Sequence, residues 1–246
     1  MPMILSHRDI EEIAAAVTRD FNYSFFGAEA EIQQRRPLPT PIDQMASEYL
    51  KLEVTFAKLS ADGSIMGLTA YTDTAYEIEE DGERHILPLR RNQIVLDSSF
   101  IQPGNVRRLC GKRRFTLAHE CAHQILFQLE EDESKADHAG KYSERRVHTP
   151  RTLKTHEDWN EWQANALGAA LLMPQAEIDR AMWYLNRSKP LMSYGDCFFD
   201  GERDCMDAFC STFGVSKSAA SIRLEQLGYL QKRDVAEYRH PLDVVV

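Results

Sequence analysis

The chain has 246 residues and a formal net charge of −9 at pH 7, from 38 acidic side chains against 29 lysines and arginines. Because phosphate binding needs clustered lysine and arginine, this balance argues against non-specific nucleic-acid binding by the whole protein. Apolar runs fall short of the roughly 20 residues that cross a bilayer, so no membrane span is expected.

Cysteine usage indicates a reducing compartment. The five cysteines are an odd number and include no CxxC pair, which favours free thiols over a disulfide framework. The N-terminal sequence MPMILSHRDIEEIAAAV also lacks the layout of a secretory signal peptide. We therefore expect a cytoplasmic protein. Cys121 lies in an apolar helix, where a buried thiol more often packs as a small side chain than acts as a nucleophile.

The first part of the chain, residues 1–50, is expected to be an N-terminal helical scaffold. Apolar residues recur at helical spacing from Ser6 to Phe21, and Ser6 is a candidate N-cap. A connection ending in RRPLPTP follows. A second helix is expected from Pro41 to Leu50.

Period-two alternation begins after Lys51 and predicts a small twisted sheet. The expected strands cover residues 52–56, 65–71, 76–78, 84–89 and 92–97. Ala61–Ser64 forms a turn, and Glu79–Gly82 forms the acidic tip of a hairpin. An exposed edge of such a sheet could hold an extended peptide by strand addition.

The segment from Arg114 to Gln128, RFTLAHECAHQILFQ, has apolar residues at helical spacing and contains the motif HExxH. His119 and His123 are four residues apart, so on a helix both imidazoles lie on one face and can reach one ion. Glu120 lies close enough to accept a proton from a metal-bound water. Buried histidines and a glutamate would be costly in an apolar helix without partners, which favours a metal site.

Two charged stretches flank this helix. Before it, we expect a solvated basic run, with docking of an acidic partner as the alternative. The run consists of Arg107, Arg108, Lys112, Arg113 and Arg114. After it, Glu130–Arg151 is polar without apolar periodicity and is predicted to be a mobile loop, in one interpretation a lid.

A further helix is predicted from a capping-box-like start, Thr155–Asp158, to the residue before Pro174. Within it, Glu161 is the best candidate for a third metal ligand. The small residues Ala164 and Gly168 would let this helix approach the first one closely, and Asn165 could orient a ligand. The competing ligand candidates are Glu157, Asp158, His148 and His156.

The C-terminal part has the layout of a helix-turn-helix. A helix is expected over Gln175–Asn186, irregular chain over Ser188–Gly201, and helices over Glu202–Phe213 and Lys217–Leu227, with Gly214 and Ser216 as caps between the last two. Lys217 and Arg223 could reach phosphates, but Glu225 and the acidic upstream helix argue against DNA contact. A packing or substrate-recognition role fits better.

Two of these segments together resemble a known family. RFTLAHECAH followed by EWQANALGAALLMP is similar to the ImmA/IrrE family of metallo-endopeptidases, whose pattern is roughly RFTLAHELGH and then ExxANxFAxxLLMP. The later FGVSKSAASIRLEQLGYL extends the resemblance, which covers roughly residues 40 to 230. Cys121-Ala122 replaces the common Leu-Gly, and Leu167-Gly168 replaces Phe-Ala, which alters no expected ligand.

The resemblance implies an α+β, zincin-like fold and a gluzincin-like protease with one zinc ion. His119, His123 and Glu161 would be its ligands, Glu120 the catalytic residue and Asn165 a supporting residue. Known members cleave a helix-turn-helix repressor of mobile-element or stress-response genes. The corresponding division of the chain is a catalytic core over residues 51–186 and a C-terminal helical segment over 187–246.

Other interpretations remain open at this stage. Candidates for stabilising the oxyanion are His148, Tyr142, His156 and Tyr194. The protein could also be a metal-bound interaction or sensing module, or a DNA-binding regulator that uses its C-terminal helices. The free carboxylate expected beside the ligands favours the enzyme, because a structural zinc site has no use for it.

Overall fold

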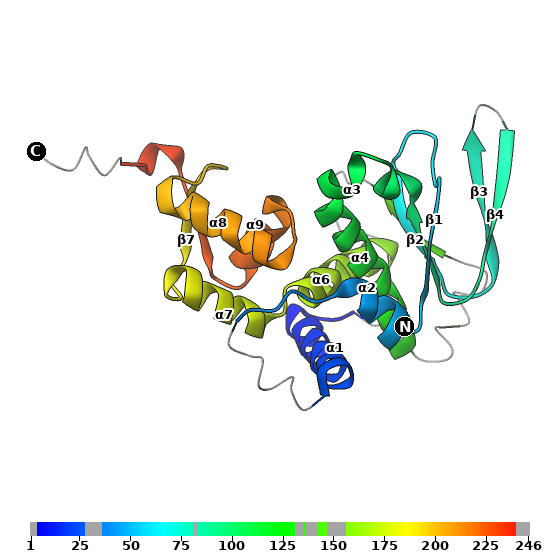
Figure 1. The fold of residues 1–246 in the computed structure, drawn as a ribbon, viewed down its shortest axis with the longest axis horizontal. Coiled ribbons are helices and arrows are strands. Elements are labelled where there is room, and N and C mark those ends of the chain that lie inside the picture. The colour runs from blue at the N-terminus through cyan, green and yellow to red at the C-terminus, as the bar shows by residue number, and fades with distance from the viewer. Residues whose placement is uncertain are drawn as a thin grey trace, which may run out of the picture.

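The computed structural model describes residues 4–27, 36–80, 83–130, 135, 142–146 and 156–239, and it has the expected mixture of helices and small sheets. Helices α4 (Cys110–Leu129) and α6 (His156–Leu172) lie at the centre (Figure 1). The strands that precede α4 in the chain lie on one side of this pair, and the C-terminal elements lie on the other (Figure 1). Within the described part of the chain, no helix has both the length and the apolar character needed to cross a membrane.

Helix α1 (His7–Phe26) begins as predicted and extends five residues past Phe21. Ser6 and Asp9 form a capping box, in which the Ser6 hydroxyl accepts a hydrogen bond from the Asp9 backbone N–H at 3.2 Å. The predicted second helix comprises α2 (Ile42–Gln44) and a π-helical turn, η2 (Met45–Tyr49). Both helices bury apolar residues in the main core, as expected of a scaffold.

The described strands next to α4 form a four-stranded sheet in the order β1-β5-β2-β6. These strands are β1 (Glu53–Ala57), β2 (Ile65–Ala70), β5 (Gln93–Asp97) and β6 (Tyr142–Arg146). Strand β1 is parallel to β5, whereas β2 is antiparallel to both β5 and β6. The hairpin of β3 (Thr74–Glu80) and β4 (Glu83–Leu89) is present as predicted and projects from the molecule (Figure 1).

Strand β6 corrects the prediction that Glu130–Arg151 is a loop throughout. The segment has no apolar periodicity, but its backbone pairs with β2 at the edge of the sheet. Ladder hydrogen bonds come from the backbone, so this pairing needs no alternating apolar pattern. The lid hypothesis falls largely on residues 131–134, 136–141 and 147–155, which lie outside the described part of the chain.

Between the sheet and α4, the chain forms a 3₁₀ turn, η3 (Ser98–Ile101), and a short helix, α3 (Asn105–Arg108). The basic run, which begins in α3 and continues in the first turns of α4, is only partly solvated. Arg113 forms two hydrogen bonds with the Asp43 carboxylate, at 2.7 and 2.9 Å, which lowers the pKa of Asp43. Arg114 donates to the backbone carbonyls of Thr40 and Phe213. These two arginines therefore join α4 to distant segments, and the prediction of a solvated face fails for them.

The C-terminal part contains α7 (Gln175–Asn186), α8 (Asp200–Phe213), α9 (Lys217–Gln226) and the 3₁₀ turn η4 (Val235–Glu237). Gly214 ends α8 with φ +61°, and the Ser216 hydroxyl caps α9, as predicted. The expectation of irregular chain over Ser188–Gly201 is wrong for β7 (Leu191–Tyr194), which pairs in parallel with β8 (Leu230–Arg233). The partner strand follows some forty residues later, so local sequence gave no sign of the pairing.

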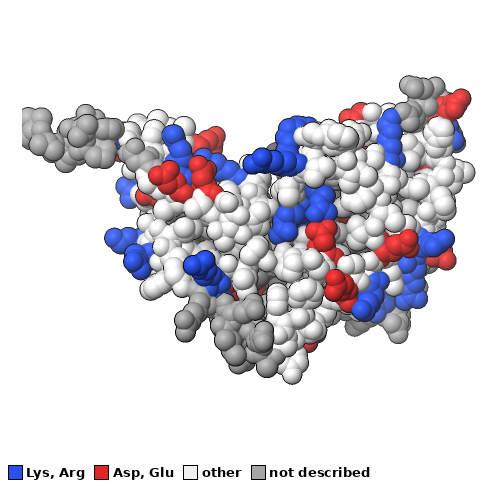
Figure 2. Space-filling view, viewed as in Figure 1, with Lys and Arg blue, Asp and Glu red and all other residues white. Residues whose placement is uncertain are grey.

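Arg223 is buried rather than available to phosphates. Its side chain is 2% exposed, and its guanidinium pairs with the Glu11 carboxylate of α1 and donates to the Met173 carbonyl after α6. Figure 2 also shows basic and acidic side chains interspersed on the face drawn, with no continuous basic surface there. The described C-terminal helices therefore offer fewer basic side chains for DNA binding than the helix-turn-helix layout suggested.

Candidate metal centre

Helix α4 presents polar side chains on two of its faces, and each face meets a different element. His119 and His123 face α6, where they meet Glu161. Thr116, Glu120 and Gln124, also four residues apart, face strand β2. All of these α4 side chains are at least 96% buried. The spacing of the HExxH motif predicted that His119 and His123 share a face of α4. The face that carries Glu120 and Gln124 is recognised only from its contacts with β2.

Helix α6 approaches α4 closely because it carries a glycine at the crossing. A Cβ atom added to Gly168 would lie 3.0 Å from the His119 backbone nitrogen and 3.1 Å from the Ala118 carbonyl carbon. Ala164 is fully buried beside it. The predicted role of small residues in this contact is confirmed, since a larger side chain at 168 would meet backbone that cannot turn aside.

The crossing brings three potential ligand side chains together. The Nε2 atoms of His119 and His123 are 3.1 Å apart. The Glu161 carboxylate lies 3.4 Å from His119 Nε2 and 3.1 Å from His123 Nε2, through different oxygens. Ligand atoms of these residues all lie within 4.8 Å of one another, in an arrangement that could hold a metal ion.

The electrostatics of the group favour an ionised carboxylate. Burial by itself would raise the pKa of the Glu161 carboxyl, but hydrogen bonds and charge from His119 and His123 outweigh it and hold the pKa well below its usual range. A carboxylate and two imidazoles form a donor set suited to a borderline-soft divalent cation.

Among the described residues, the other ligand candidates do not join this group. Glu157 is exposed at the start of α6, and Asp158 lies one residue further on. His148 and the side chain of His156 lie outside the described residues. Asn165 donates to the backbone carbonyl of Glu161 at 2.8 Å, and its predicted role in orienting the Glu161 carboxylate stays a prediction.

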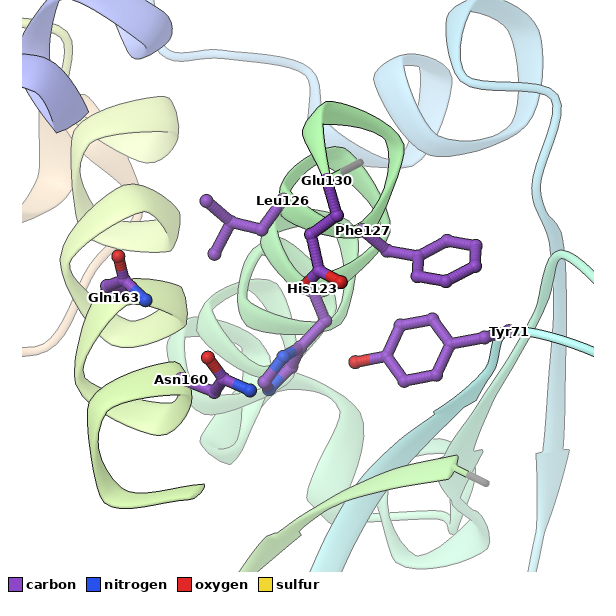
Figure 3. A pocket seen from close by; sticks show the side chains of 7 residues that line it. All are labelled: Tyr71, His123, Leu126, Phe127, Glu130, Asn160 and Gln163. Atoms are coloured by element: carbon purple, nitrogen blue, oxygen red, sulfur yellow. The ribbon is translucent and has the colours of Figure 1, made fainter. Parts of the chain in front are cut away.

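A small, partly open pocket lies beside His123 (Figure 3). It is lined by Tyr71, His123, Leu126, Phe127, Glu130, Asn160 and Gln163. The Asn160 amide and the Tyr71 hydroxyl both point into it toward His123. The Tyr71 ring is 6% exposed and packs against Phe127, with centroids 4.7 Å apart.

Tyr71 is the residue that sequence reasoning missed, because it was assigned only as the end of an apolar strand. Tyr194, which was considered for the oxyanion role, lies instead in an aromatic cluster with Phe199 and Tyr238. The side chains of His148, Tyr142 and His156 lie outside the described residues. The one available signal for Tyr71 was its position at the end of a predicted strand.

Cys121 behaves as a core side chain. It is fully buried on α4, and burial raises the pKa of its thiol well above the ordinary value. Since the thiolate is the nucleophilic form, this environment disfavours a cysteine mechanism. The five cysteines are free thiols.

Comparison with known proteins gives one family match. Residues 110–225 match a peptidase family, M78, described as the IrrE N-terminal-like domain. The match begins at the first residue of α4 and includes His119, Glu120, His123 and Glu161. No curated protein matches the chain.

Proposed function

Because residues 110–225 belong to the IrrE N-terminal-like family of metallopeptidases, we propose that the protein is a zinc-dependent endopeptidase that cleaves a regulatory protein. The observation that carries the proposal is the meeting of His119, His123 and Glu161 beside the buried Glu120. Two histidines, a glutamate and an open position form a known catalytic zinc arrangement.

The spacing of the donor atoms fits zinc. Ligands about 2.0–2.1 Å from a tetrahedral ion lie roughly 3.3–3.4 Å from one another. The separations among His119 Nε2, His123 Nε2 and the Glu161 carboxylate are 3.1, 3.1 and 3.4 Å. These side chains thus need little movement to serve as three ligands. We propose that Asn165, which donates to the Glu161 backbone carbonyl, helps to hold the third of them.

The chemistry divides between the metal and the side chains. Zinc in such a site supplies Lewis acidity, which polarises a peptide carbonyl and lowers the pKa of water. Glu120 accepts a proton from the attacking water while the water oxygen bonds to the carbonyl carbon. As the carbon–nitrogen bond breaks, Glu120 returns that proton to the leaving amine. Tyr71 points its hydroxyl into the same pocket and donates a hydrogen bond to the carbonyl oxygen.

The proposed substrate is a helix-turn-helix repressor, as in the family that the sequence resembles. Direct DNA binding is a weaker candidate, because Arg223 is held in an internal ion pair.

The proposal is tested by co-expressing the chain with repressors encoded next to its gene. We expect the wild type to cleave one of them, and the Glu120→Gln variant to be slower by about a hundredfold to ten-thousandfold while retaining zinc. The substitution keeps size and removes basicity, so metal content, measured by mass spectrometry, separates lost catalysis from lost metal.

Two results would contradict the proposal. If Glu120→Gln cleaves the repressor at the wild-type rate, Glu120 is not the proton acceptor. A metal-loaded crystal structure in which the Glu161 carboxylate lies far from both imidazoles would show that Glu161 is not a ligand. If the protein instead binds the repressor with equal affinity in both forms and cleaves nothing, the sensing-module alternative would replace the enzyme.

A further inference from the structure

Strand β2 lies against the buried face of α4 that carries Glu120. A Cβ atom added to Gly67 of β2 would lie 2.6 Å from Thr116 Cγ2, 3.0 Å from Glu120 Oε1 and 3.3 Å from Glu120 Cγ. Glu120 and Thr116 are both fully buried. The carboxylate expected to move the proton is therefore packed directly against the backbone of this strand.

A second contact fixes how β2 and α4 align. Gln124, one helical turn after Glu120, donates from its amide to the Thr69 hydroxyl at 2.6 Å and to the Ala70 carbonyl at 3.0 Å. Gln124 is 1% exposed, so this contact is internal. Since Gly67 and Thr69 are two residues apart on β2, they meet Glu120 and Gln124 on the same face of the sheet.

Gly67 and Thr69 alternate with Leu68 and Ala70, so Gly67 lies on the α4 face, and an irregularity in β2 comes just before it. The register with β6 shifts between Ile65 and Gly67. Ile65 and Leu68 pack in the core under the β3–β4 hairpin, whereas Met66 packs in the main core with α4. Met66, next to Gly67, thus packs in a different core from Ile65 and Leu68. Bulges of this kind occur beside active sites, where they redirect a strand position.

We propose that Gly67 is a positioning residue for Glu120: its lack of a side chain lets β2 act as the wall that sets where the carboxylate lies relative to His119 and His123. The inference rests on the proposed function for its catalytic consequence, but not for the contact itself. A methyl group at 67 would collide with the stiff, β-branched Thr116 and push the Glu120 carboxylate aside.

The test is Gly67→Ala, measured on the zinc-loaded full chain with the repressor that the wild type cleaves. We expect kcat to fall about a hundredfold, since a misplacement of 1 Å can have that effect, with KM and zinc content unchanged. Gly201→Ala is the matched control, because a Cβ there has no heavy atom within 4 Å. The double variant Gly67→Ala/Thr116→Ser removes the methyl that the new Cβ meets, and should recover part of kcat.

The outcomes separate this inference from the proposed function. If the wild type cleaves and Gly67→Ala has wild-type kcat, the positioning role is wrong and the enzyme assignment stands. If the wild type cleaves nothing, crystal structures of the wild type and Gly67→Ala decide. A displaced Glu120 carboxylate supports the role, and a shift below about 0.5 Å would overturn it. Loss of zinc together with activity in Gly67→Ala would also overturn the positioning role, because β2 would then be supporting the metal ligands and not Glu120 alone.

Discussion

Two histidines four residues apart on a helix can form a three-ligand metal site only if a third ligand side chain lies opposite them. In this chain the partner is Glu161, whose carboxylate reaches both Nε2 atoms while Glu120, one residue from His119, turns toward β2. At the scale of single residues, the proposed ligands and the proposed proton acceptor thus lie on two faces of one helix. Tyr71, which directly follows β2, points its hydroxyl into the pocket beside His123.

Replacing Tyr71 tests its proposed contact with the carbonyl oxygen. Tyr71→Phe removes the hydroxyl and keeps the ring that packs against Phe127, so the fold should be unaffected. We expect kcat to fall about a hundredfold with little change in KM, as on removal of one oxyanion donor. Steady-state kinetics of repressor cleavage measure both kcat and KM. Tyr194→Phe, in the aromatic cluster away from the pocket, should keep wild-type kcat; equal kcat for both variants would exclude Tyr71.

At the scale of elements, the crossing of α4 and α6 determines whether the three proposed ligands meet. Gly168 sets the distance between these helices, and Arg113 and Arg114 anchor the first turns of α4 to Asp43, Thr40 and Phe213. The helix is therefore fixed at its start by ion pairing and hydrogen bonds, and along its middle by close packing. Neither contact involves a ligand, yet both determine where the ligands lie.

Enlarging Gly168 should loosen the metal site. Gly168→Ala would place a Cβ 3.0 Å from the His119 backbone nitrogen, so the helices must separate. We expect a loss of about 1–3 kcal/mol of stability, typical of overpacking, and at least about tenfold weaker zinc binding. Urea denaturation and competition with a chromogenic chelator measure the two effects. Gly111→Ala in α4 is the control, since its nearest contact is 3.4 Å; unchanged zinc affinity in Gly168→Ala would show that the crossing tolerates a methyl group.

At the scale of the whole molecule, one hydrophobic core includes residues from α1 to β8. Arg223 of α9 crosses it to reach Glu11 of α1, and the backbone N–H of Leu5 donates to Gln163 of the pocket wall at 2.7 Å. The C-terminal helices are therefore packed onto the domain that carries the site. The predicted separation of residues 187–246 as a segment of its own stays a prediction.

Removing the buried guanidinium should weaken the molecule as a unit. Arg223→Ala leaves the Met173 carbonyl and the partly exposed Glu11 carboxylate without the guanidinium, and we expect a loss of about 1–3 kcal/mol of stability, less than for a fully buried pair. Urea denaturation at pH 7 measures the loss, and Glu11→Gln in the same background should recover part of it. Arg8→Ala, which breaks the exposed pair with Glu12, should leave the midpoint unchanged. A similar midpoint for Arg223→Ala and the wild type would show that α9 is not held by this contact.

The sequence alone determined the helix that carries His119, Glu120 and His123, most strand positions and the caps at Ser6, Gly214 and Ser216. These features depend on periodicity and spacing within a few turns of chain. Other features required the tertiary structure: the meeting of Glu161 with both imidazoles, the wall at Gly67, strands β6 and β7, the pocket position of Tyr71 and the burial of Arg223. Each of these joins segments distant in sequence, and such pairings are chosen by packing and backbone hydrogen bonding across the fold, which leave no local pattern.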